Sequence, residues 1–263
     1  MKKVHILCIR KVWWSTALAL VLVFSTLSIA TSPTVVGALA VSRQLPIYCV
    51  DTEEKVLSIS FDAAWGNEDT EQIIEILEEY DVKATFFVVG DWVDRFPDSV
   101  KALFDAGHEI MNHSNDHAHY PKLSSEEIIA DLTACNDKIE AITGVRPTLV
   151  RLPYGDYDDK VIVAIRSLGM EPIQWDVDSL DWKDVTAEQI SSRVLDKCTS
   201  GSIVLFHNAA INTPAALPTI LERLLTDGYT FCKISEIIYT EEYTIDHTGK
   251  QFLVLPQAEA EST

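Results

Sequence analysis

Hydrophobic and polar positions alternate in blocks between residues 55 and 240. Seven short apolar runs lie at 56–61, 84–89, 108–111, 147–150, 171–175, 202–206 and 229–234. Amphipathic stretches lie between them, at 69–80, 97–106, 124–143, 158–168, 186–198 and 213–226. Strands that alternate with helices are typical of βα units and predict a mostly parallel sheet. The pattern therefore predicts an α/β fold, a single barrel-like domain of about seven parallel strands.

Local sequence features support two of the helix starts and suggest where the domain ends. Ser124 with Glu127, and Thr186 with Gln189, each have the spacing of a capping box. Residues 41–52 are short and mixed in character, which predicts a linker, and the domain is expected over 53–240. The segment 241–263 is charged and ends in PQAEAEST, which predicts a frayed tail.

The N-terminus has the pattern of an export sequence. Four basic residues within the first 11 positions precede the uncharged stretch 12–30. Residues 1–40 are therefore predicted to be a signal peptide or a membrane anchor. An A-x-A cleavage site at 38–40 favours the first, and the length of the apolar stretch equally allows the second. Either way the rest of the chain is expected outside the cytoplasmic membrane, secreted or anchored by residues 12–30.

Composition narrows the possible functions. Hydrophobic residues make up 47% of the 263, too many for a disordered chain. The net charge of −19 excludes a general nucleic-acid binder, because a negative field repels phosphates. The five cysteines show no paired spacing, which favours free thiols over a disulfide or zinc framework.

Reactive side chains follow the apolar runs directly. They are Asp62, His113, His117, Arg151, Asp176, Asp178, Asp181 and His207. Because the carboxyl ends of parallel strands form one rim of a barrel, these side chains are expected to converge there. His113 and His117 form an H-x-x-x-H pair, which can share a divalent metal on one turn. His108 and His119, close by, are expected to be surface or structural residues.

Five motifs resemble those of the polysaccharide deacetylases with a NodB-homology domain, carbohydrate esterase family four. They are Ser60-Phe61-Asp62, His113-Ser114 with His117, Arg151 with Pro153-Tyr154-Gly155, Asp178 with Asp181-Trp182, and Leu205 with His207. They occur in the family's order, and the likeness covers roughly 53–239. The family fold is a distorted (β/α) barrel of about seven strands. The resemblance implies hydrolytic N-deacetylation of a cell-wall polysaccharide, with peptidoglycan favoured over a chitin oligomer.

The resemblance also implies roles for these residues. His113 and His117 would hold a divalent metal, zinc or cobalt. Asp62 would be the general base, paired with Arg151. His207 would be the general acid, oriented by Asp181, an assignment that general acid–base chemistry supports.

Substrate contacts are implied in the same way. The backbone N–H of Tyr154 would help to bind the oxyanion of the tetrahedral intermediate. Trp182 and Leu205 would line the slot for the acetyl methyl group. The expected partner is the wall glycan, with no nucleic acid, with the membrane only through an uncleaved N-terminus, and with the chain as a monomer.

One position departs from the family pattern. The metal-dependent members carry a second Asp directly after the base, whereas this chain has Ala63. Three outcomes stay open: Asp62 turns to the metal, Glu68 or Asp69 supplies the third ligand, or metal binds weakly or not at all. The alternative function is therefore a wall-glycan-binding barrel with weak or no turnover. Family branches with an altered first motif are associated with sporulation and cell-wall maturation.

Overall fold

The computed structural model describes residues 43–183 and 185–254. The predicted signal peptide or anchor lies outside these residues, so that prediction stays untested. Within the described part of the chain, no helix is long and apolar enough to cross a membrane.

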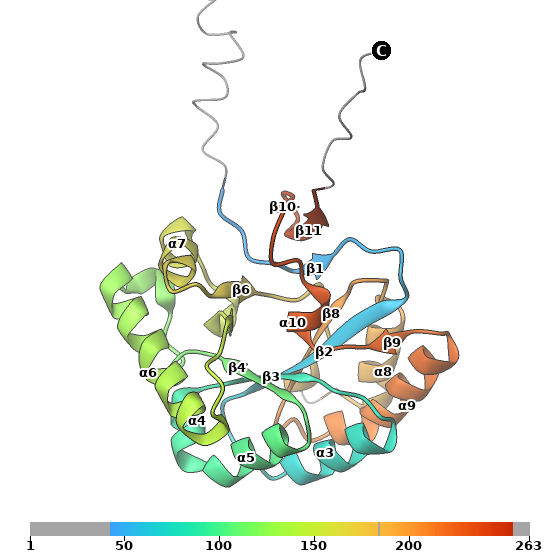
Figure 1. Ribbon diagram of the computed structural model, residues 1–263. Coiled ribbons are helices and arrows are strands. Elements are labelled where there is room, and N and C mark those ends of the chain that lie inside the picture. The colour runs from blue at the N-terminus through green and yellow to red at the C-terminus, as the bar shows by residue number, and fades with distance from the viewer. Residues whose placement is uncertain (1–42, 184, 255–263) are drawn as a thin grey trace, which may run out of the picture. The chain divides into compact units, whose positions relative to one another are not determined.

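A curved parallel sheet forms the centre of the fold, with helices around its outside (Figure 1). Its strands are β2 (Val56–Ala63), β3 (Thr85–Val88), β4 (Glu109–Asn112), β5 (Leu149–Arg151), β6 (Glu171–Ile173), β7 (Val177–Asp178), β8 (Ile203–His207) and β9 (Thr230–Phe231). The order is β6-β5-β4-β3-β2-β8-β7, β9 pairs with the start of β2, and all these pairings are parallel. The prediction of a distorted barrel of about seven parallel strands is confirmed.

The helices follow the predicted amphipathic stretches closely. They are α3 (Thr70–Glu79), α4 (Gly90–Arg95), α5 (Pro97–Asp105), α6 (Ser125–Thr143), α7 (Asp159–Ser167), α8 (Ala187–Leu195), α9 (Thr213–Thr226) and α10 (Ile234–Ile237). Both capping boxes are formed, at the start of α6 and of α8. The sequence did not predict α4 and α10, because four to six residues are too few to show a helical period.

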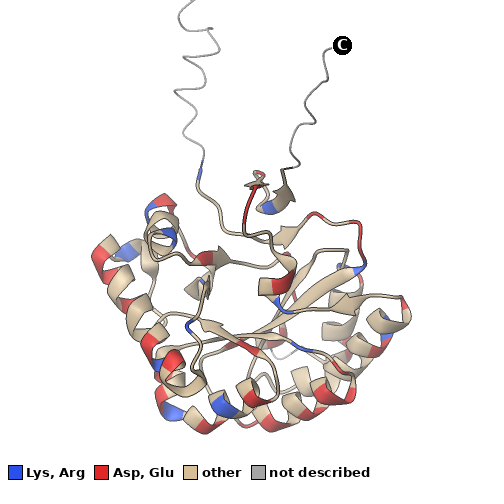
Figure 2. Cartoon of the chain, in the orientation of Figure 1, with Lys and Arg blue, Asp and Glu red and all other residues tan. Residues whose placement is uncertain are grey.

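Burial on both faces fixes the central strands. Phe61 of β2 stacks on Phe86 of β3 at 4.8 Å and on Phe206 of β8 at 5.5 Å between ring centroids. All three rings are buried, and such aromatic pairs add to the free energy of area burial. Charged residues lie mostly on the surrounding helices (Figure 2). The core thus holds the strands whose carboxyl ends carry the reactive side chains.

A small second sheet occupies the segments predicted as linker and tail. It consists of β1 (Cys49–Val50), β10 (Tyr243–Ile245) and β11 (Lys250–Leu253), in the order β1-β11-β10. The structure thus differs from the prediction up to residue 254, and residues 255–263 lie outside the described part. The difference arises because β1 and β10 are too short to show strand periodicity.

Residues 47–50 also tie this sheet to the barrel. Ile47 bridges to Ile173 of β6, and Cys49 bridges to Ser202 just before β8. The backbone N–H of Val50 donates to the carbonyl of Gly201 at 2.9 Å. Because Ile47 and Val50 are buried, this segment is part of the core rather than a free linker.

Candidate active site

A pocket of about 470 Å³ opens at the carboxyl ends of the parallel strands. Its lining contains seven of the predicted site residues: Asp62, His113, His117, Tyr154, Trp182, Leu205 and His207. The other two, Arg151 and Asp181, are buried behind it and hydrogen-bond to Asp62 and His207. The structure therefore brings all nine predicted residues together, from segments up to 145 positions apart in the sequence.

Asp62 lies at the end of β2 and is held by Arg151 from the end of β5. Arg151 Nη1 donates to Asp62 Oδ1 at 3.0 Å and to Ser60 Oγ at 2.8 Å. Its Nη2 donates to the Gln174 carbonyl at 3.1 Å, and the guanidinium lies 4.2 Å from the ring centroid of Phe87. With Arg151 fully buried, the carboxylate has one fixed orientation, with Oδ2 turned toward His113.

The surroundings of Asp62 favour its charged form. Burial by itself raises the pKa of a carboxyl group, but His113, Arg151 and His207 outweigh it and lower the pKa of Asp62 below its ordinary value. Asp62 is therefore ionised at neutral pH and able to accept a proton.

His207 ends β8 and pairs in register with Asp62 on the neighbouring strand. Its Nδ1 lies 2.7 Å from Asp181 Oδ1, and its backbone N–H donates to Asp181 Oδ2 at 2.8 Å. Thr213 Oγ1 donates to the same Oδ2 at 2.8 Å, so both oxygens of the Asp181 carboxylate have hydrogen-bond partners. Burial lowers the pKa of His207, but the hydrogen bond to Asp181 and its charge outweigh burial and raise it.

The rings of His113 and His117 meet edge to face, and His113 lies on the Oδ2 side of Asp62. The Nδ1 of His113 lies 2.9 Å from the Arg151 carbonyl, so Nδ1–H donates and Nε2 is left unprotonated, 3.5 Å from Asp62 Oδ2. The two imidazole centroids are 4.9 Å apart, and His117 Nδ1 is buried without a hydrogen-bond partner. Burial lowers the pKa of His113, and that of His117 to about 4. Both rings are therefore neutral at pH 7, as metal ligands must be.

The donor set is nevertheless incomplete for a three-ligand metal centre. Ala63, buried at the end of β2, has no ligand atom. Glu68 and Asp69 do not complete the set, because they line a different pocket, next to Ala209 and Ile211. No group of three His, Cys, Asp or Glu side chains suited to a metal ion occurs within 43–183 and 185–254.

Several loops around the pocket have strained backbone. Ser114, His117, Tyr154, Leu180 and Ala209 all have positive φ between 56° and 71°. Non-glycine residues adopt this conformation at a cost that the surrounding structure must offset, and such residues concentrate at functional sites. These five positions lie in the loops that follow β4, β5, β7 and β8, whereas Asp81 and Glu242, which also have positive φ, lie away from the pocket.

Other residues of the pocket were not singled out from the sequence. They are Ala64, Trp65, Leu152, Trp175 and Gly155, the last of which was named only as part of a motif. Asp178, expected at this rim with the other reactive side chains, also lines the pocket. Trp65 is the most exposed, with 62% of its surface accessible. A Trp that follows a strand does not differ in sequence from a core Trp, so only the structure identifies it.

The remaining polar candidates have structural roles. Asp176 accepts hydrogen bonds from Ser202 Oγ and Ile203 N, both at 2.8 Å. His108 is buried, and its Nδ1 accepts from the Ala84 N–H at 3.2 Å. His119 stacks on the Tyr154 ring at 4.0 Å and supports that side chain from outside.

The family model and two relatives that this chain resembles are described as deacetylases. Residues 50–173 match the family model described as polysaccharide deacetylase. The peptidoglycan-N-acetylmuramic acid deacetylase PdaC of Bacillus subtilis is 34% identical over 188 residues, 72% of this chain and 40% of PdaC. The peptidoglycan-N-acetylglucosamine deacetylase PgdA of Listeria monocytogenes is 35% identical over 75% of this chain and 41% of PgdA. This chain therefore spans about two fifths of the length of these relatives.

Solved structures resemble the chain over a similar extent. Wild-type BA3943 of Bacillus anthracis, described as a CE4 family pseudoenzyme, superposes with a TM-score of 0.71 and 36% identity, covering 74% of this chain and 69% of that one. A BA3943 mutant described as having restored enzymatic activity gives a TM-score of 0.71 and 37% identity over 74% and 71%.

Proposed function

Because this chain belongs to the polysaccharide deacetylase family, carbohydrate esterase family four, we propose that it hydrolyses N-acetyl groups of amino sugars in a cell-wall glycan. One observation carries the proposal. Asp62 and His207 are register partners on neighbouring strands and face one pocket, each held by a buried ionic partner. PdaC and PgdA, named for N-acetylmuramic acid and N-acetylglucosamine of peptidoglycan, support peptidoglycan as the polymer.

The proposed reaction uses these two groups for proton transfer. Asp62 takes a proton from water, whose oxygen attacks the acetyl carbonyl carbon and forms a tetrahedral oxyanion. The C–N bond then breaks as His207 gives its proton to the departing nitrogen, so that acetate and a free amine result. The Tyr154 N–H would stabilise the oxyanion, while Trp182 and Leu205 would enclose the methyl group.

In this proposal, a metal ion would be held by two histidines. Deacetylases of this family are generally metal-dependent. His113 Nε2 and His117 would be this chain's ligands for zinc or cobalt, and Ala63 leaves the set one carboxylate short.

Acetate release from N-acetylglucosamine oligomers and peptidoglycan, with and without Zn²⁺ or Co²⁺, tests the proposal. We expect the wild type to release acetate and His207→Ala to lose about 10²–10⁴-fold in rate. His247→Ala, a substitution at an exposed histidine between β10 and β11, is the matched control and should retain the wild-type rate. Equal rates for the wild type and His207→Ala would contradict the acid assignment.

Ala63 favours a second candidate function, a glycan-binding barrel with weak or no turnover. The similarity to BA3943, described as a pseudoenzyme, supports it. If Ala63 is the missing ligand position, Ala63→Asp should tighten Zn²⁺ binding, because it adds a carboxylate beside two neutral imidazoles. Titration calorimetry on both proteins measures this, and equal affinities would mean that the position has no part in metal binding.

A further inference from the structure

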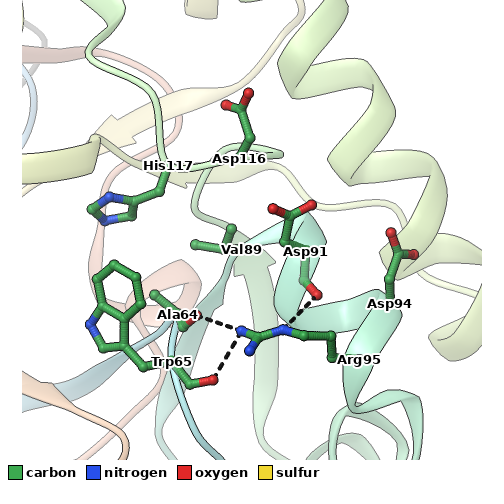
Figure 3. A pocket seen from close by; sticks show the side chains of 8 residues that line it. All are labelled: Ala64, Trp65, Val89, Asp91, Asp94, Arg95, Asp116 and His117. Carbon is green, nitrogen blue, oxygen red and sulfur yellow. Dashed lines mark hydrogen bonds between the residues drawn. The ribbon is translucent and has the colours of Figure 1, made fainter.

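A second pocket adjoins the catalytic one on the other side of Trp65. It has a volume of about 460 Å³ and is lined by Ala64, Trp65, Val89, Asp91, Asp94, Arg95, Asp116 and His117 (Figure 3). Ala64, Trp65 and His117 line both pockets. A ligand with a reacting group in the catalytic pocket can therefore extend past Trp65 into the second pocket, as a polymer does. We call this second pocket the side pocket.

The Trp65 indole is an exposed ring on a fixed backbone. Nη2 of Arg95 donates to the carbonyls of both Ala64 and Trp65 at 2.9 Å (Figure 3). On the next residue, the Gly66 carbonyl accepts from Trp92 Nε1 at 2.7 Å. Trp65 as a residue remains 62% exposed, and its ring lies 5.6 Å from the His117 ring. A flat, exposed indole on a fixed main chain suits stacking on an apolar sugar face or on a cation.

The charges around the side pocket are mainly negative. Figure 3 shows Asp91, Asp94 and Asp116 on the side away from the indole. Asp94 is paired with Lys138 at 2.7 Å. Asp91 and Asp116 have no basic side chain within 4.0 Å among the residues that the structure describes.

Arg95, a basic residue of this lining, offsets only part of the negative charge of the three Asp side chains. The Arg95 guanidinium donates to three main-chain carbonyls, including that of Asp91, and to no carboxylate. Among the described residues, the side pocket thus offers an aromatic face opposite Asp91, which has no basic side chain within 4.0 Å, and Asp116, whose side chain lies against that of Asp131.

We propose that the side pocket binds the sugar next to the one that reacts, and that it prefers a sugar whose nitrogen is a free, protonated amine. The inference rests on the proposed function and narrows its substrate to partly deacetylated glycan. An ammonium group gains the field of Asp91 and Asp116 and the face of Trp65, whereas a neutral N-acetyl group gains only stacking. Since a free amine is also the product of the reaction, each product sugar would favour reaction at its neighbour.

Binding calorimetry on the full-length protein tests this preference without requiring turnover. The ligands are the trimer of glucosamine and the trimer of N-acetylglucosamine, each at low and at high salt. We expect the glucosamine trimer to bind about three- to tenfold more tightly at low salt, with the difference shrinking at high salt. Equal binding, or tighter binding of the acetylated trimer, would overturn the proposal.

Variants that neutralise carboxylates test whether the preference for the glucosamine trimer arises in the side pocket. Asp91→Asn with Asp116→Asn should abolish it, while Trp65→Ala should weaken both trimers. The matched control is Glu75→Gln with Asp98→Asn, two exposed carboxylates on α3 and α5 outside both pockets, and it should keep the wild-type preference. A preference that survives in the Asp91/Asp116 variant would overturn the assignment to this pocket.

The acetate assay separates the two proposals. Acetate release without a preference for the glucosamine trimer would overturn only the side-pocket assignment. A preference without acetate release would overturn only the deacetylase assignment.

Discussion

At the scale of single residues, Arg151 holds the Asp62 carboxylate in place and favours its charged form. Arg151→Met removes the partner of a buried carboxylate and should cost about 3–5 kcal/mol of the free energy of unfolding at pH 7. The loss should shrink at lower pH, because without Arg151 burial raises the pKa of Asp62 and the group takes up a proton. Chemical denaturation at several pH values measures both effects.

The double variant Asp62→Asn with Arg151→Met is the control. Since it removes both charges of the buried pair, it should be more stable at pH 7 than Arg151→Met alone. The lowered pKa of Asp62 fixes the sign for the wild type. Its contribution to stability is present above the unfolded pKa of about 3.9 and disappears as the pH falls through the folded value. A loss in Arg151→Met that does not depend on pH would contradict the pairing.

The proton-donating form of His207 should depend on pH in the opposite direction to the charged form of Asp62. Asp181 raises the pKa of His207, so the imidazolium that donates the proton is present below that pKa and is lost as the pH rises through it. Asp181→Asn removes the charge, and the alkaline limb of the kcat/KM profile should move to lower pH while the rate falls about 10²–10⁴-fold. An alkaline limb that does not move would show that another group titrates there.

The same scale shows what the sequence could predict of the site. Asp62, Arg151 and His207 were identifiable because each follows an apolar run, and parallel strands bring such positions to one rim. The role of Trp65 could not be predicted, since exposure depends on how Arg95 and Trp92 hold the neighbouring backbone. The third metal position also needed coordinates, because only they show Glu68 facing another pocket.

At the scale of elements, a substitution at Gly201 tests whether the segment 47–50 packs on the barrel. Gly201 has φ of +80°, and an added Cβ would collide with the Val50 carbonyl. Gly169 has φ of +70° with nothing within 4 Å of an added Cβ. A substitution by alanine there would therefore introduce backbone strain but no steric clash. Gly169→Ala should cost about 1–2 kcal/mol, and Gly201→Ala a further 1–3 kcal/mol or so, because Val50 must move.

Thermal or chemical unfolding of both variants measures the difference. Equal losses would show that residues 47–50 do not pack on the barrel as described. A larger loss for Gly169→Ala would have the same meaning.

The elements also show where sequence patterns fail. Every predicted strand from 56–61 to 229–234 is present. Burial on both faces gives β2, β3 and β8 a continuous apolar run, whereas β9 is partly exposed and pairs with the start of β2. The strands β1 and β7, with two residues each, carry no period of their own and form only because a neighbouring strand is already in place. Gln251 of β11 is buried through two hydrogen bonds to the Tyr239 backbone, which no hydrophobicity pattern reveals.

At the scale of the whole molecule, we propose that the protein acts outside the cytoplasm. The basic N-terminus followed by the uncharged stretch 12–30 supports this, as do relatives named for peptidoglycan. In fractionated cells the protein should be sensitive to external protease once the wall is removed, in the membrane or the secreted fraction. A protease-protected cytoplasmic pool would contradict the proposed location.

The most direct test of the account is acetate released from peptidoglycan by the wild type and by Asp62→Asn, with bound metal measured in the same preparations. We expect many acetates per wild-type molecule, and for Asp62→Asn a rate about 10²–10⁴-fold lower with unchanged metal content and folding. If the wild type binds glycan but releases no acetate with Zn²⁺ or Co²⁺, the barrel is a glycan-binding protein and the deacetylase assignment is wrong.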